Sequence, residues 1–130
     1  MVDYINTHSY QIKKPTLYNT PNFDICNFTT HTFDYMWAQS VFTHIPSASI
    51  ERCIKNMIPY LNNDGSFYAT FWINDEIILK DAHGSRMNEF KFSKQPFEFY
   101  EEICNGFCGV EHIGEWNHPS HQQLLRFYND

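Results

Sequence analysis

One stretch of the sequence, residues 33–73, restricts the fold more than any other. It opens at residues 33–40 with a nearly continuous apolar and aromatic run, a pattern typical of a strand covered on both faces. Apolar residues then recur at spacings of three and four, which predicts an amphipathic helix. These residues are Ile50, Cys53, Ile54, Met57, Ile58 and Leu61. Residues 66–73 are rich in β-forming side chains and predict a second strand, so the order indicates a parallel pair in an α/β sheet.

The ends of the predicted helix carry capping and turn residues. Pro46 and Ser47 stand where a helix start favours a fixed φ and a capping oxygen. The Asn-Asn-Asp-Gly sequence at residues 62–65 favours a turn and predicts that the helix stops before the second strand. Pro59 removes one backbone hydrogen bond, so we expect a loosened last turn.

The last third of the chain predicts a second helix and a hairpin. The helix opens at Pro96 and ends near Gly106 and Gly109, with one apolar face. That face contains Phe97, Tyr100, Ile103, Cys104 and Phe107. Residues 110–114 and 122–128 predict two strands in an antiparallel pair, joined by a turn at residues 117–120. Residues 74–94 are polar and favour a loop, and a short helix near residues 76–80 is left open.

Length and charge limit the classes of protein that this chain can represent. Its 130 residues suit a single domain, whose residues 1–31 are predicted to be a mostly irregular lead-in. Nine Lys and Arg against fifteen Asp and Glu give a net charge of −6, which argues against a nucleic-acid partner. No run approaches the roughly 20 apolar residues of a membrane span, and no signal peptide is recognisable. We therefore expect a soluble, cytoplasmic protein without a membrane partner.

The cysteines and histidines raise the question of a metal site. Four cysteines at irregular positions favour reduced thiols over a disulfide framework. Cys104 and Cys108, with the histidines that follow at positions 112, 118 and 121, provide suitable zinc ligands. Their spacing does not fit a common zinc finger, and Cys104 belongs to the predicted apolar helix face. We therefore predict no metal site.

Several sequence segments together resemble a known family. The segment FDYMWAQSVFTHIP at residues 33–46 is the most specific, followed by Gly-Phe at residues 106–107 and Trp-Asn-His-Pro at residues 116–119. They resemble the carboxyl-terminal two thirds of class I S-adenosylmethionine-dependent methyltransferases. The resemblance implies a partial Rossmann-like sheet, α/β in class, with helices on its faces and a C-terminal antiparallel hairpin. It also implies that the family's fourth, fifth, seventh and sixth strands lie side by side in that order.

The sequence departs from the family where the cofactor is normally held. The family has a glycine-rich loop after its first strand, where the backbone approaches the cofactor closely. The five glycines of this chain form no Gly-x-Gly, and none lies between an early strand and a helix. Pro59 stands where the family commonly has an arginine, and residues 63–65 lack the family's paired glycines.

The resemblance nevertheless implies which residues bind S-adenosylmethionine. Asp3 would accept a hydrogen bond from the adenine amino group, and Tyr4 would pack on the ring. Gln39 and Ser40 would line the methionine side, and His44 is the candidate catalytic base. Two alternatives stay open: His44 holds the turn after the strand by a hydrogen bond, and Asp3 is an ordinary exposed acid.

Three further residues are candidates for the pocket of the methyl acceptor. Trp72 and Trp116 would wall that pocket at the carboxyl ends of the strands, and plain core packing is the alternative for both. Gln122 would reach the pocket from the hairpin, or it is an ordinary exposed strand residue.

Two functions follow from these observations. The first is methyl transfer from S-adenosylmethionine to a small-molecule or otherwise unknown acceptor. The second is a non-catalytic, truncated half-domain that acts as an interaction or oligomerisation module. The strand from Phe33 to Ser40 would have an unpaired edge, which either another chain or the irregular amino-terminal segment must cover. In the second case a homodimer or a complementing chain would cover it.

Overall fold

The computed structural model describes residues 13–73 and 94–130, which form one mixed sheet and its covering helices. The elements are η2 (Ile25–Asn27), β1 (Phe33–Ala38), α2 (Ser47–Met57), η3 (Ile58–Tyr60), β2 (Leu61–Ile73), β3 (Lys94–Gln95), α3 (Phe97–Cys104), β4 (Gly109–Glu115) and β5 (Gln123–Tyr128). The expected loop, with residues 76–80 inside it, lies outside the described residues, apart from Lys94, which opens β3. No helix in the described ranges has the length and apolar character that crossing a membrane requires.

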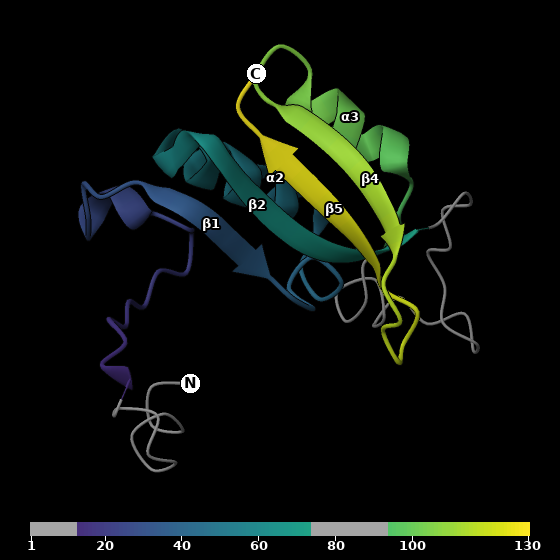
Figure 1. The fold of residues 1–130 in the computed structure, drawn as a ribbon, viewed down its shortest axis with the longest axis horizontal. Helices are drawn as coiled ribbons and strands as arrows, with labels where there is room; N and C mark the ends of the chain where they lie inside the picture. The colour runs from purple at the N-terminus through teal and green to yellow at the C-terminus, as the bar shows by residue number, and fades with distance from the viewer. Residues whose placement is uncertain (1–12, 74–93) are drawn as a thin grey trace.

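The strands follow the order β1-β2-β5-β4, with β3 paired to the end of β2 (Figure 1). β1 runs parallel to β2, while β5 is antiparallel to both β2 and β4. The helix α2 connects the two parallel strands, as the strand, helix, strand pattern predicts. The predicted α/β class with its antiparallel C-terminal hairpin is confirmed.

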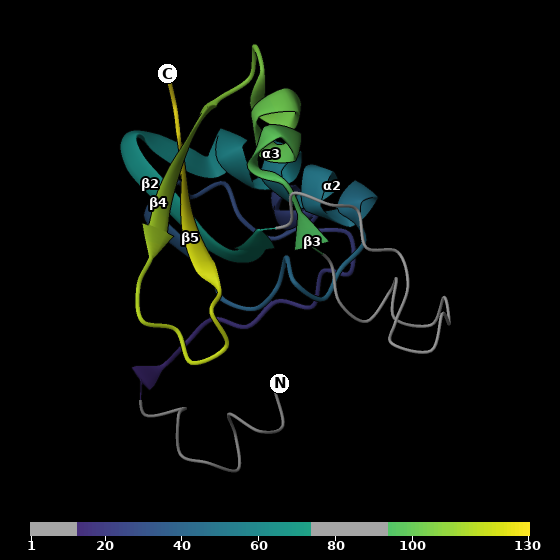
Figure 2. The ribbon, with the colours of Figure 1, turned by 90° about the vertical axis from the view of Figure 1, so that its right-hand side faces the viewer.

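Both helices cover the same face of the sheet (Figure 2). The core lies between them and the strands, where Tyr100 of α3 stacks on Phe42 and meets Phe71 of β2 edge to face. The residues of α2 that reach this core are Ile50, Cys53 and Ile54, which keep 3% or less of their surface exposed. These three belong to the predicted apolar face, so the helical period correctly identified the core side of α2.

The prediction that the first strand is covered on both faces is wrong for the described part of the chain. Met36 and Ala38 of β1 point into the core, but Tyr35 is 77% exposed and Trp37 is 52% exposed. The strand alternates, and its second set of side chains lies on the face opposite the helices, hereafter the open face. An uninterrupted apolar run therefore does not prove burial on both sides.

The Asn-Asn-Asp-Gly sequence forms an irregularity inside β2 rather than a turn that precedes it. Phe33 pairs with Leu61 and Tyr35 with Ser66, so β2 has extra residues opposite Asp34. The Asn62 amide donates to the Asp34 carboxylate at 2.7 Å, which ties this irregularity to β1. A Cβ on Gly65 would lie 2.9 Å from the Asp34 carbonyl oxygen, so only glycine allows this approach.

The carboxyl-terminal ends of both helices agree with the predicted positions of Pro59 and Gly106, but the predicted capping oxygen of Ser47 is wrong, because Pro46 is the N-cap of α2 and no side chain caps it. The predicted loosening at Pro59 is confirmed, because α2 ends at Met57 and continues as the 3₁₀ turn η3. The helix α3 begins at Phe97, directly after Pro96, and ends at Cys104. Gly106 follows with a φ of +71°, and Phe107 lies beyond the helix with 41% of its surface exposed.

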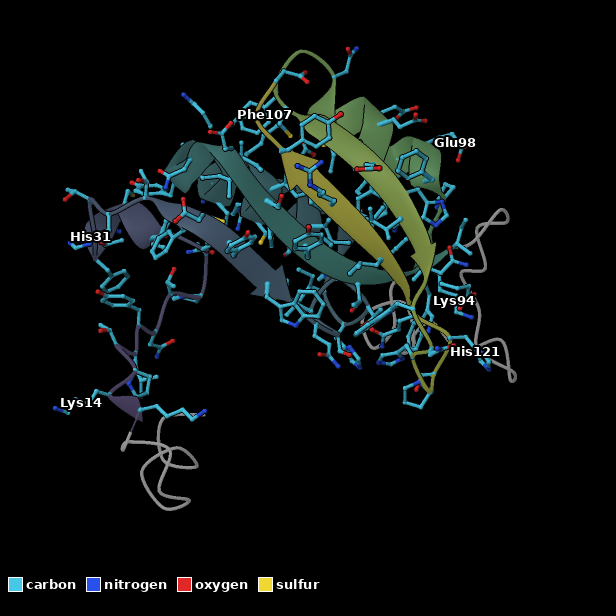
Figure 3. All side chains as sticks on the ribbon, in the orientation of Figure 1. Lys14, His31, Lys94, Glu98, Phe107 and His121 are labelled. Atoms are coloured by element: carbon cyan, nitrogen blue, oxygen red, sulfur yellow. The ribbon has the colours of Figure 1, made fainter. Side chains whose placement is uncertain are left out.

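Residues 13–32 lead into β1 from its amino-terminal side, and Asn22 attaches this segment to α2. Asn22 accepts a hydrogen bond from Arg52 through its side chain and one from Asn56 through its backbone oxygen. In Figure 3, Lys14 and His31 mark this segment, at the opposite side of the molecule from His121. Among the described residues, β1 pairs with β2 alone, so its other edge has no strand beside it.

The position of the core predicts that two isoleucine-to-alanine substitutions change the free energy of unfolding by different amounts. Ile54→Ala removes a fully buried side chain of α2 and should lower the free energy of unfolding by about 2–5 kcal/mol. Ile113→Ala, at a β4 position that is 45% exposed, should change it by less than about 0.5 kcal/mol. Urea denaturation of both variants measures the difference, and equal losses would contradict this placement of the core.

Candidate functional site

The candidate site lies where β1 and β2 end and β5 begins. The chain leaves β1 at Ala38 and passes through a loop that contains Gln39, Ser40 and His44 before α2 starts. The antiparallel strand β5 brings its preceding residue, Gln122, to the same end of the sheet, next to Thr70 of β2. Carboxyl ends of parallel strands are the usual place for ligands in open α/β sheets.

Three polar side chains form a closed set of hydrogen bonds at this end of the sheet. The Ser40 backbone N–H donates to Thr70 Oγ1 at 2.8 Å, and Thr70 Oγ1 donates to Gln122 Oε1 at 2.6 Å. Gln122 Nε2 donates to Ser40 Oγ at 3.1 Å and completes the polar ring, the name used below for Ser40, Thr70 and Gln122. Because Gln122 is only 3% exposed, the alternative that it is an exposed strand residue is wrong.

The backbone of Ser40 has an unusual conformation. Its φ is +58°, in the left-handed region that non-glycine residues seldom adopt. Such a residue persists only where surrounding contacts hold it, and the polar ring provides these contacts through both the backbone and the side chain of Ser40. The chain thereby turns sharply out of β1 and directs the next residues across the end of the sheet.

His44 is anchored to the same turn through one ring nitrogen. Its Nδ1 lies 2.8 Å from the Ser40 carbonyl oxygen and 2.7 Å from Thr43 Oγ1. A carbonyl oxygen can only accept, so Nδ1 carries the proton in this contact and the basic lone pair of the neutral ring belongs to Nε2. The hydrogen bond that holds the turn is present, and it is compatible with a basic Nε2 on an exposed side chain.

The two candidate tryptophans have different surroundings. Trp72 is half-buried, donates from Nε1 to the Ser120 carbonyl oxygen at 2.8 Å, and has its ring 6.3 Å from that of His44. Trp116 instead meets Trp37 edge to face at 5.7 Å, and its ring lies 5.4 Å from that of His118. Neither belongs to the hydrophobic core, so plain core packing does not describe them.

The indole N–H of Trp116 is a buried donor, and no described group accepts a hydrogen bond from it. Buried donors without acceptors are rare in proteins, and each requires an explanation. Gln39 has an exposed side chain in the loop after β1. The structure therefore brings Ser40, His44, Trp72 and Gln122 together, whereas Asp3 and Tyr4 lie outside the described residues.

Sequence reasoning overlooked Thr70 and considered His112 only as a possible zinc ligand. Thr70 is fully buried in β2 and interrupts the apolar run at residues 67–73, which was the available signal. His112 of β4 stacks on Phe97, meets Phe71 edge to face and contacts the Gln123 side-chain oxygen. A single sequence offers no signal for the role of His112, because its neighbours come from three separate elements.

The two cysteines that flank the α3 end behave as a thiol pair. A hydrogen bond from the Cys104 thiol to Cys108 raises the pKa of Cys104, together with burial, and lowers the pKa of Cys108. Cys53 is isolated in the core, where burial raises its thiol pKa to about 12. Within residues 13–73 and 94–130, no group of three or more His, Cys, Asp and Glu side chains is placed to hold a metal ion.

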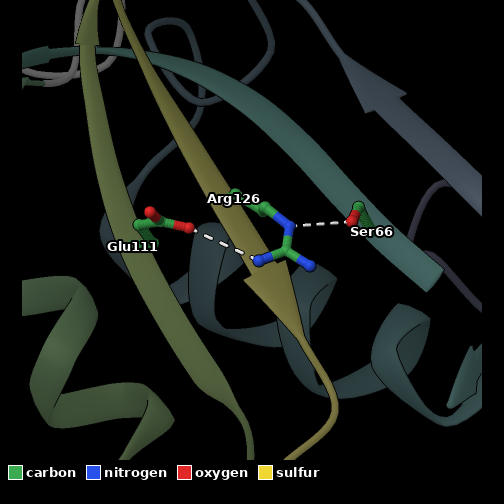
Figure 4. A network of polar contacts seen from close by, with 3 residues as sticks. All are labelled: Ser66, Glu111 and Arg126. Atoms are coloured by element: carbon green, nitrogen blue, oxygen red, sulfur yellow. Dashed lines mark hydrogen bonds and ion pairs between the residues drawn. The ribbon is translucent and has the colours of Figure 1, made fainter. Parts of the chain in front are cut away.

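The open face carries polar as well as aromatic side chains. Arg126 of β5 donates to Ser66 Oγ at 2.8 Å and pairs with Glu111 of β4 at 3.4 Å (Figure 4). The guanidinium also lies over the Tyr128 ring, 4.8 Å from its centroid. These contacts link β2, β5 and β4 across the open face, while Tyr35 and Trp37 lie on β1 at its edge.

Comparison with known proteins identifies the fold. No protein-family model and no curated protein matches the sequence. Solved structures do match: an O-methyltransferase family protein from Burkholderia thailandensis superposes with a TM-score of 0.65 at 9% identity, over 97% of this chain and 39% of that chain. The mitomycin 7-O-methyltransferase MmcR gives a TM-score of 0.66 at 7% identity, over 98% of this chain and 38% of that chain.

A third match is OxaC, solved in complex with S-adenosylhomocysteine and oxaline, with a TM-score of 0.63 at 13% identity. It covers 97% of this chain and 33% of that chain. The chain therefore has an S-adenosylmethionine methyltransferase-like fold, and the expected strand order is confirmed. It spans between a third and two fifths of the length of these three structures.

The Trp72 hydrogen bond to Ser120 predicts that removal of the indole N–H lowers the free energy of unfolding. Trp72→Phe keeps an aromatic ring but loses the bond to Ser120, and it should lower the free energy of unfolding by about 0.5–1.5 kcal/mol. Trp37→Phe, at a half-exposed position of β1, should cost less than about 0.5 kcal/mol. Chemical denaturation compares the two, and a larger loss for Trp37→Phe would contradict the assignment.

Proposed function

We propose that the chain acts in methyl transfer from S-adenosylmethionine to an acceptor at the carboxyl ends of β1 and β2. The observation that carries the proposal is the cluster of Ser40, His44, Thr70 and Gln122 at these strand ends, in a methyltransferase-like fold. In this fold class the strand ends are where a ligand is bound. Solved structures with this fold include an O-methyltransferase family protein, the mitomycin 7-O-methyltransferase MmcR, and OxaC in complex with S-adenosylhomocysteine.

The described residues fit one side of the cofactor. The exposed Gln39 amide is a donor suited to a carboxylate such as that of the methionine part. The Trp37 and Trp116 rings suit a nearby cation such as the sulfonium. No described glycine is placed to hold the nucleoside side of the cofactor. The four described glycines lie in β2, in β4 or after α3, and none opens a helix after a strand.

Bound S-adenosylmethionine supplies an electrophilic methyl group to an acceptor. The residues of this chain would contribute by positioning the reactants. The turn at Ser40 fixes the loop that contains His44, and Trp72, whose ring lies next to that of His44, binds the hairpin turn through its hydrogen bond to Ser120. His44 Nε2 would accept the proton of an acceptor hydroxyl, with Nδ1 held by the Ser40 carbonyl oxygen.

Calorimetric titration of the full chain with S-adenosylmethionine tests the proposal. We expect saturable one-to-one binding with a Kd of about 0.1 mM, because a ligand held mainly on one side keeps only part of its affinity. Gln39→Ala should weaken binding about tenfold through the loss of a hydrogen bond. Glu98→Gln, on the exposed face of α3, is the matched control and should bind as the unaltered chain does. The absence of saturable heat would overturn the proposal.

No described strand pairs with the second edge of β1, which favours a second candidate function, association with another copy of this chain. Edges in soluble proteins are usually protected by Lys, Pro or a covering element. β1 has neither Lys nor Pro, and its single charge, Asp34, is bonded to Asn62 on the same chain. Two β1 edges related by a two-fold axis would pair without facing charges and bring the exposed Tyr35 and Trp37 of both copies together.

Light scattering after size exclusion decides whether the chain associates. We expect a dimer whose fraction rises with concentration, and Trp37→Lys should shift it to monomer by placing like charges across the axis. Ile113→Lys is the matched control, because it adds the same charge on β4 at the opposite edge of the sheet. Pairing through β1 would be rejected if the chain were a monomer at every concentration. It would also be rejected if Trp37→Lys and Ile113→Lys lowered the dimer fraction equally.

A further inference from the structure

We infer that Gln122 and Thr70 are positioning residues, which set the proton-accepting nitrogen of His44 through the turn at Ser40. This inference rests on the proposed function for its purpose, but its geometry stands independently. It changes the role that resemblance implies for Gln122, from a side chain that meets the acceptor to one that holds the loop.

The hydrogen bonds of the polar ring have a defined direction. The Ser40 N–H can only donate, so Thr70 Oγ1 accepts from it and directs its own proton to Gln122 Oε1. Gln122 Oε1 therefore serves as an acceptor, and its amide nitrogen faces Ser40 Oγ as a donor. Gln122 Oε1 also lies 3.2 Å from Ser40 Oγ, so both polar atoms of the Gln122 side chain contact Ser40.

Burial prevents these groups from serving a ligand directly. Thr70 is fully buried and Gln122 is 3% exposed, so their polar atoms are satisfied by each other and by Ser40. A ligand that took one of these bonds would leave a buried donor or acceptor unpaired, which is costly. Their effect on the site must pass through the residue that they hold.

That residue is Ser40, whose backbone is held on both sides. Its N–H is bound by Thr70, and its carbonyl oxygen receives the His44 Nδ1–H at 2.8 Å. Because φ is +58°, release of the N–H would let the backbone relax toward an ordinary conformation and move the carbonyl oxygen. His44 Nδ1 would then keep Thr43 Oγ1 as its described partner, a hydroxyl that can donate as well as accept, so the Nδ1–H tautomer would no longer be selected.

Thr70→Val tests the inference, because valine has the shape of threonine without the hydroxyl. We expect the His44 imidazole ¹⁵N shifts to change from a predominant Nδ1–H form to a mixture of tautomers. Amide exchange at Ser40 should become about tenfold faster. Thr70→Ser restores the hydroxyl and should restore both readings.

Ser66→Ala is the matched control, since Ser66 lies on the same strand and the same face and its buried hydroxyl bonds Arg126 instead. It should leave the His44 shifts unchanged even though it also removes a buried hydrogen bond. Unchanged His44 shifts in a folded Thr70→Val variant, or equal changes in Ser66→Ala, would overturn the inference. The His44 ¹⁵N shifts and the Ser40 amide exchange rate are both measured without ligand. They therefore test the positioning role of Thr70 and Gln122 separately from the binding of S-adenosylmethionine.

Discussion

The parallel pairing of β1 with β2, closed on one face by α2, is the constraint on which the rest of the structure depends. Parallel neighbours require a crossover, and α2 provides it while burying Ile50, Cys53 and Ile54 against the sheet. This unit aligns the carboxyl ends of both strands. The turn after β1 and the buried Thr70 of β2 consequently meet at one end of the molecule.

The site depends on this alignment more than on any single reactive group. Ser40 adopts a backbone conformation that is costly alone, and hydrogen bonds from a second strand and from the hairpin stabilise it. His44 takes its orientation from the same turn. Chemistry at this end of the sheet would therefore depend on buried groups of β2 and on the residue before β5 as much as on the exposed histidine.

The open face explains why two functions compete for this fold. Helices cover one side of the sheet, and Tyr35 and Trp37 remain exposed on the other (Figures 1 and 2). This methyltransferase-like fold spans a third to two fifths of the length of the three matched structures, and its sequence has polar side chains at the strand ends but no Gly-x-Gly. Catalysis would use the carboxyl ends of β1 and β2, whereas association would use the edge of β1.

The sequence alone determined the type and approximate position of the main helices and strands, because periodicity and turn chemistry are local properties. Residues 47–57 and 97–104 form helices where their apolar spacing predicts them, and Pro59 and Gly106 lie at the helix ends as expected. The strand order also follows from the resemblance of residues 33–46 to the methyltransferases. Asp3 and Tyr4 stay predictions, because they lie outside the described residues.

Only the tertiary structure decided which side chains meet. Gln122 is 82 residues from Ser40 along the chain, and nothing in either local sequence indicates that the two share hydrogen bonds with Thr70. The exposure of Tyr35 and Trp37 was equally inaccessible, since an apolar run does not show whether a second layer covers it. Local spacing selects helix or strand, but burial and hydrogen-bond partners depend on elements that come together only when the chain folds.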